Sequence, residues 1–344
     1  MSRIDARAWV VWTLTTLVVA SSTRNPLYVL LLLMITLVVS VAWASAQDHR
    51  RALSPLRFAA IAVPMAALFN GLTAHLGDTV LMRLPEWLPL LGGPVTLEAL
   101  FFGATNGLTL TAIFGGFATF NQVTSARDLV RLAPRAFHEA GVVLSIALTF
   151  IPHTTRSLAR IREAQAVRGH RVRGLRDWLP IMVPLLVSGL ERSMGLAEAM
   201  VARGYGAVDG RARPVALQAI LAGGLLTTLG GWLARSFLPR LAGWGTGSLV
   251  LGTLMLLLGL RLAGRSVRRT RYRATAWGVE ETLVVAGVVA ALLGTLAPLP
   301  GVDRLTLAYV PYPRLIAPPF DPLLAVLLMG LLVPAALAVA RRQS

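Results

Sequence analysis

The stretch "HTTRSLARIREAQAVRGHRVRGLRD", residues 153–177, decides how this chain folds, because it lies between two apolar runs, 140–152 and 178–190. It contains seven arginines: Arg156, Arg160, Arg162, Arg168, Arg171, Arg173 and Arg176. If both runs crossed a membrane, all seven would face outward, although arginine-rich loops normally stay in the cytoplasm. If the stretch itself crossed, each arginine would cost about 2.5–3.5 kcal/mol at mid-membrane, or roughly 20 kcal/mol together. We therefore expect 137–210 to form cytoplasmic helices, whose apolar runs pack on the membrane interface or on a partner.

The second of these runs is also expected to be interrupted, because Pro180 and Pro184 lie within it and an internal proline removes a helical hydrogen bond. Outside this region, the chain offers longer apolar runs, and a membrane span needs about 20 such residues. The eight better candidates are roughly 8–22, 27–46, 57–76, 97–121, 215–235, 246–262, 277–297 and 322–340.

The loops between the eight runs differ in charge. With the N-terminus inside, the arginine-rich loops all fall on the cytoplasmic side, and both termini are cytoplasmic. The opposite loops, around 77–95, 236–245 and 298–321, contain fewer arginines and more proline and glycine. We expect three parts: N-terminal transmembrane helices at 1–136, cytoplasmic helices at 137–210, and C-terminal transmembrane helices at 211–344.

The composition supports the membrane class. The chain is 55% hydrophobic and 14% charged, with a mean hydropathy of +0.66, whereas a soluble protein has about 25% charged residues. It contains no cysteine, which excludes disulfides, thiolate metal sites and thiol nucleophiles. We predict an all-α polytopic membrane protein with about eight transmembrane helices plus the cytoplasmic helices.

The basic charge has a single source. The net charge is +17 and no lysine occurs, so all 33 basic residues are arginine. This usage is typical of a GC-rich bacterial genome, and we expect a bacterial inner membrane. Nucleic-acid binding would need a basic face with stacking aromatic residues, and no such cluster is visible.

A pattern within 153–177 occurs again further along the chain. "RIREAQAVRGHR", 160–171, and "GLAEAMVARGYG", 195–206, both contain Glu-Ala, three residues, and then Arg-Gly. The acidic residues are Glu163 and Glu198. The Arg-Gly pairs are Arg168-Gly169 and Arg203-Gly204.

Each copy predicts one helix end. At about 100° per residue, Leu196, Met200 and Arg203 share one face, and Ile161, Gln165 and Arg168 share the corresponding face of the first copy. The following glycine ends the helix, since it adopts the left-handed conformation at little cost.

Two interpretations of the pattern are open. An arginine in a last helical turn complements the helix dipole, and glycine ends many helices. Two copies in the same register instead favour two protruding tips, whose guanidinium groups make forked hydrogen bonds to a partner. Two similar tips imply two similar sockets, most simply on a dimeric partner.

The pattern resembles the transmembrane T component of energy-coupling factor transporters, which are vitamin and metal-ion importers of the ATP-binding cassette class. That family has two Ala-Arg-Gly motifs at the ends of cytoplasmic coupling helices. The second motif matches as Ala202-Arg203-Gly204, and the first departs from it as Val167-Arg168-Gly169. The order of "FNGL" at 69–72, "TLEALFFGATNGLTL" at 96–110 and "SARDLVRLAPRAF" at 125–137 is also similar, so the resemblance covers about 1–235.

The resemblance implies a scaffold that couples two ATP-binding cassette ATPase subunits to a substrate-binding integral membrane subunit, within the lipid bilayer. The implied ATPase-docking residues are Val167, Arg168, Gly169, Ala202, Arg203 and Gly204, with Glu163, Glu198 and Met200 beside them. No cofactor is implied, and the transported substrate and the role of 246–340 stay open.

The chain itself is not expected to be an enzyme. A P-loop requires a lysine, which this sequence lacks, so ATP hydrolysis would belong to partner subunits. His138, His153 and His170 are scattered without metal-ligand spacing, and no catalytic or metal residues are predicted. The alternative is a polytopic membrane enzyme or a stand-alone permease that uses acidic residues at span ends, namely Glu98, Glu280 and Glu281.

Overall fold

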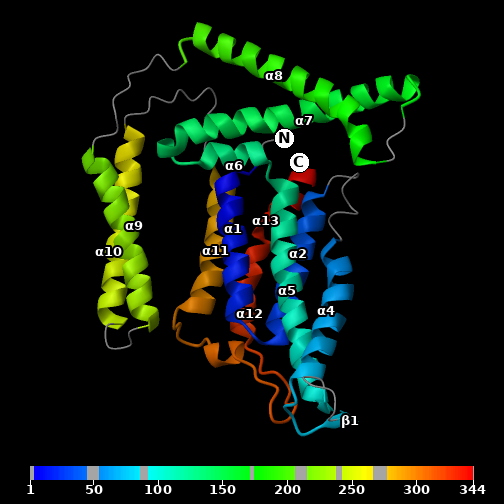
Figure 1. Ribbon diagram of the computed structural model, residues 1–344. Coiled ribbons are helices and arrows are strands. Elements are labelled where there is room, and N and C mark those ends of the chain that lie inside the picture. The colour runs from blue at the N-terminus through cyan, green and yellow to red at the C-terminus, as the bar shows by residue number, and fades with distance from the viewer. Residues whose placement is uncertain are drawn as a thin grey trace. The chain divides into compact units, whose positions relative to one another are not determined.

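The computed structural model is shown in Figure 1 and describes residues 4–44, 54–85, 92–170, 174–205, 215–237, 242–265 and 277–343. Helices dominate these residues. The chain divides into two compact units, the first formed by Met1–Ser125 with Arg273–Ser344 and the second by Ala126–Tyr272. The predicted division at 136 and 210, which separates transmembrane from cytoplasmic helices, stays a prediction.

The first unit joins the two ends of the sequence. Its N-terminal elements are α1 (Ala6–Ser22), α2 (Pro26–Trp43), α4 (Ser54–Thr73), β1 (Val80–Leu84), β2 (Gly93–Thr96) and α5 (Leu97–Val123). Its C-terminal elements are α11 (Val279–Leu296), η4 (Arg304–Leu307), α12 (Pro322–Met329), η5 (Gly330–Leu332) and α13 (Val333–Gln343). The two strands pair antiparallel, and β2 leads directly into α5.

Polar residues set where these helices begin. Asp5, Asn25, Thr96 and Asp321 each cap a helix, with a side-chain oxygen that accepts a hydrogen bond from a backbone N–H in the first turn. Such caps satisfy donors that have no partner within the helix. The boundaries of α1, α2, α5 and α12 therefore follow from the local sequence.

The C-terminal helices belong to the core of the first unit. The indole N–H of Trp12 donates to the Leu331 carbonyl at 2.9 Å, and that of Trp43 donates to the Pro334 carbonyl at 2.9 Å. Trp12 and Leu331 are fully buried. Since an unsatisfied polar group is costly in an apolar interior, these bonds tie α13 and η5 to α1 and α2. The residues beyond α10 thus complete the N-terminal bundle.

Small residues allow α5 to approach α4 closely. A Cβ placed at Gly103 would lie 2.4 Å from the Ala66 carbonyl oxygen, and one at Gly107 would lie 2.8 Å from the Val63 Cα. This small-residue spacing is typical of helix pairs in membranes.

The second unit is also helical. It contains α6 (Ala126–Leu132), η1 (Arg135–Phe137), α7 (His138–Val167), η2 (Leu175–Trp178), α8 (Leu179–Ala202), α9 (Val215–Phe237) and α10 (Ala242–Arg265). Helices α9 and α10 pack on each other through glycines. A Cβ at Gly231 would lie 2.8 Å from the Gly245 carbonyl oxygen.

The all-α membrane fold predicted from the sequence is confirmed, with a different set of candidate spans. Among the described residues, nine helices are long and apolar enough to cross a membrane by length and composition alone. They include Glu139–Val167 and Arg176–Ala202, which we expected to lie in the cytoplasm. The predicted span in α1 is a helix of 17 residues and is not among the nine.

The predicted interruption of the second apolar run is wrong. Helix α8 continues through Pro184, and Pro180 lies in its first turn. Proline lacks the N–H that would bond to the carbonyl four residues earlier. Here that carbonyl belongs to Pro180, and it accepts a hydrogen bond from the Gln165 side chain at 3.3 Å. The neighbouring helix therefore satisfies the group that Pro184 leaves free.

Candidate functional site

The first candidate tip is the end of α7. The helix runs to Val167, Arg168 is its C-terminal cap residue, and Gly169 has φ +77°. The Gly169 N–H donates to the Ala166 carbonyl and the His170 N–H donates to the Gln165 carbonyl, both at 2.9 Å. This pair of bonds is a Schellman motif, the common helix end with a left-handed glycine.

The second candidate tip, at the end of α8, has the same geometry. Arg203 caps the helix and Gly204 has φ +76°. The Gly204 N–H donates to the Val201 carbonyl and the Tyr205 N–H donates to the Met200 carbonyl, again both at 2.9 Å. The repeated sequence pattern therefore produces two helix ends with one hydrogen-bond arrangement.

Both tips are open to a partner. Arg168, Arg203, Glu163 and Glu198 are exposed, and so is Ala202. Within the described residues, neither arginine forms an ion pair, and no heavy atom lies within 4 Å of a Cβ built on either cap glycine. Each guanidinium can thus offer its planar set of N–H donors to carboxylate or carbonyl oxygens.

The predicted helix faces are visible in the burial pattern. Ile161 and Gln165 in α7 are half-buried, and so are Leu196 and Met200 in α8, while most of their neighbours are exposed. Val167 occupies the first position of the variant motif and is 90% exposed. The side chain of Val167 therefore makes little contact with the described residues, and both tips have the same hydrogen-bond arrangement despite the valine.

The connection between the two helices contains contacts that the sequence did not reveal. The Arg162 guanidinium lies 6.0 Å from the centroid of the Trp178 ring, within cation–π range. A His170 ring nitrogen lies 2.7 Å from the Asp177 carbonyl oxygen. With the bond from Gln165 to Pro180, these contacts hold the first tip against the start of α8. Pro180 and Pro184 predicted an interrupted helix and gave no indication of this joint between α7 and α8.

A first prediction tests the role of the cap glycines. Gly204→Ala adds a Cβ to a residue with φ +76°. This left-handed conformation costs a residue with a Cβ about 1–2 kcal/mol. The amides of residues 204 and 205 should therefore exchange hydrogen about 5 to 30 times faster. Gly195→Ala is the matched control, because Gly195 lies inside α8, its added Cβ would meet no heavy atom within 4 Å, and alanine favours the helix. Equal exchange in both variants would contradict the cap assignment.

The acidic residues at span ends are engaged in the fold of the first unit. Glu98 is fully buried, and its carboxylate accepts the Thr79 N–H at 3.2 Å. Glu281 accepts the N–H groups of Gly278 and Asp5, and Glu280 pairs with Arg341. No metal-binding cluster of His, Asp or Glu occurs in the part of the chain that the structure describes. These contacts explain the carboxylates as structural groups.

Comparison with known proteins assigns the family. The family model described as "CbiQ: Cobalt transport protein" matches residues 1–214. Proteins named "Energy-coupling factor transporter transmembrane protein EcfT" from Streptococcus thermophilus and Bacillus subtilis are each 38% identical to the chain, over 82 and 85 residues. Another from Brevibacillus brevis is 40% identical over 82 residues. The matched part covers 22% of this chain and 31% of each relative. Because the family model covers more than half of the sequence, the chain belongs to the CbiQ cobalt transport protein family.

Proposed function

We propose that this multi-pass membrane protein is the energy-coupling transmembrane component of an ATP-driven importer of vitamins or metal ions. The transmembrane helices hold a substrate-binding integral membrane subunit. Helices α7 and α8 transmit the movement of two ATP-binding cassette ATPases to that subunit. The chain is a non-catalytic component, and its bilayer is the bacterial inner membrane.

One observation carries this proposal, namely the two Schellman-capped helix ends with exposed arginines in the same register. A pair of ATPase subunits presents two similar binding sites, and two helix ends of the same geometry would fit them. The relatives named EcfT support the same assignment. The proposed docking residues are the motif residues at 167–169 and 202–204, with Glu163, Glu198 and Met200 beside them.

Co-purification tests the proposal directly. The full chain, expressed with the ATPase and membrane subunits from its own genome, should bring two ATPase subunits and one membrane subunit through affinity purification and gel filtration. A stand-alone permease or an enzyme would elute without them. If the chain transports substrate in vesicles that contain no other subunit, the proposal is wrong.

A second prediction concerns topology, which the proposal fixes. The tips must face the cytoplasm, where ATPases reside, and both termini lie on the same side. Since the chain has no cysteine, single cysteines report cleanly. Ser157→Cys in α7 should react with an impermeant maleimide only in inverted vesicles. Leu305→Cys, whose native side chain is 81% exposed, should react only in intact cells. Labelling of position 157 in intact cells would place the tips on the wrong side.

A further inference from the structure

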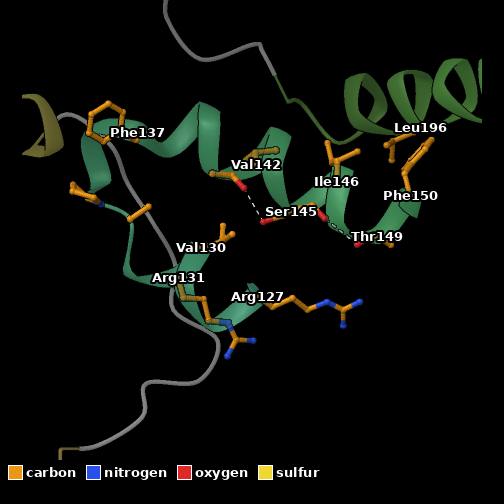
Figure 2. Close-up of a pocket in the computed structure, with 13 residues that line it drawn as sticks. Arg127, Val130, Arg131, Phe137, Val142, Ser145, Ile146, Thr149, Phe150 and Leu196 are labelled. Atoms are coloured by element: carbon orange, nitrogen blue, oxygen red, sulfur yellow. Dashed lines mark hydrogen bonds between the residues drawn. The ribbon is translucent and has the colours of Figure 1, made fainter. Parts of the chain in front are cut away.

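A pocket of about 710 Å³ lies within the second unit, and its lining includes none of the motif residues of either tip. It is lined by α6, the following turn and the first half of α7, with one residue from α8, as Figure 2 shows. Its volume falls in the range of small-ligand sites. The proposed docking of ATPases does not use it.

The lining of the pocket is amphipathic. The apolar part comes from η1, α6, α7 and α8, namely Phe137, Val130, Val142, Ile146, Phe150 and Leu196. The cationic part comes from α6, where Arg127 and Arg131 are one helical turn apart. In Figure 2 the two guanidinium groups extend away from the apolar side chains. The ligand that fits this lining has an anionic end and an apolar body.

The positive charge of Arg127 and Arg131, which form the cationic edge of the pocket, is largely available to a ligand. Arg131 lies 3.8 Å from Asp128, but its side chain is 72% exposed, and such a pair contributes little in water. Arg127 is exposed and forms no ion pair with any described residue. The lining thus contains two guanidinium groups, of which only Arg131 lies near a carboxylate, and the net positive edge complements a phosphate.

The chain connectivity limits how far the start of α6 can lie from the end of α5. Helix α5, a candidate membrane span, ends at Val123, and α6 begins at Ala126. Three peptide units reach at most about 11 Å. The arginines of α6 are therefore within reach of the head groups of the leaflet where α5 ends. Basic sites at this depth are typical of anionic lipid recognition.

We propose that this pocket binds one anionic phospholipid. Arg127 and Arg131 hold the phosphodiester, and the upper acyl chains lie on the apolar lining while their remainder extends into the bilayer. Leu196 shares its helix face with Met200 and Arg203, so the bound lipid touches the same α8 that ends in the second tip. The inference does not depend on the coupling function.

Native mass spectrometry of the full chain in detergent tests this proposal, with phosphatidylglycerol and phosphatidylcholine as probes. Phosphatidylglycerol should bind at one saturable site, and phosphatidylcholine should bind less tightly. The double variant Arg127→Ala/Arg131→Ala should weaken phosphatidylglycerol binding about thirtyfold, as expected for two cationic contacts. The control Arg156→Ala/Arg160→Ala removes equal charge from exposed positions of α7 outside the pocket and should bind normally.

Two further arms separate a lipid from a free phosphate. Ile146→Trp fills the apolar lining and should also weaken phosphatidylglycerol binding, while millimolar inorganic phosphate should not displace the lipid. If inorganic phosphate competes and Ile146→Trp binds normally, the pocket is a phosphate site and the proposal is overturned. Equal loss in the pocket and control arginine variants would also overturn it, since binding would then follow overall charge.

Discussion

The double variant Arg168→Ala/Arg203→Ala should lose ATPase docking and transport almost completely, while the membrane part remains folded. Both side chains are exposed at helix ends and contribute to no ion pair among the described residues. Their removal therefore leaves the unbound chain intact. Truncating an arginine that is paired in a protein interface costs about 2–5 kcal/mol, or roughly thirtyfold or more in affinity for each tip.

The single variants and a control sharpen this test. Arg203→Ala should weaken binding at least as much as Arg168→Ala, because its motif has the family's alanine at position 202. Arg203→Lys should rescue poorly, since an ammonium cannot form the planar fork of a guanidinium. The control is Arg156→Ala/Arg160→Ala, which removes the same charge earlier in α7. Pull-down of the ATPases measures binding by these three single variants and the control. If the tip variants bind as well as the control, the arginines are ordinary helix-end residues.

The tips were predictable from the sequence because their determinants are local. A Schellman motif needs a left-handed residue one position beyond the cap, and Gly169 and Gly204 supply it directly after each arginine. The repeat then fixes the register of both ends. The helix starts at Asn25 and Asp321 follow from equally local capping.

The joint between the helices was not predictable because it depends on contacts across the chain. Pro184 should end a helix on local grounds, but the Gln165 side chain satisfies the carbonyl that the proline leaves free. The pocket likewise depends on how α6, α7 and α8 come together. Periodicity in one segment contains no information about such pairings.

The role of the last helices also depends on contacts between residues distant in sequence. A substitution at one of two packed glycines tests this role. The sequence beyond the family match looked like an addition of unknown role. In the structure, Gly287 of α11 meets Gly330 of η5, and a Cβ on Gly287 would lie 2.2 Å from the Gly330 carbonyl oxygen. Because the obstacle is backbone, a single added methyl group must push α11 and η5 apart.

Gly287→Ala should therefore destabilise the first unit by about 1–3 kcal/mol or more, the usual cost of overpacking a filled interior. The unfolding midpoint of the full chain in detergent should fall by about 5 °C or more. Gly230→Ala, in α9, is the matched control, since a Cβ there meets no heavy atom within 4 Å and alanine is favoured over glycine within a helix by about 1 kcal/mol. The two substitutions are chemically identical but should shift the midpoint in opposite directions. If both raise it equally, α11 and η5 do not pack at this distance, and the C-terminal helices are separable from the N-terminal bundle.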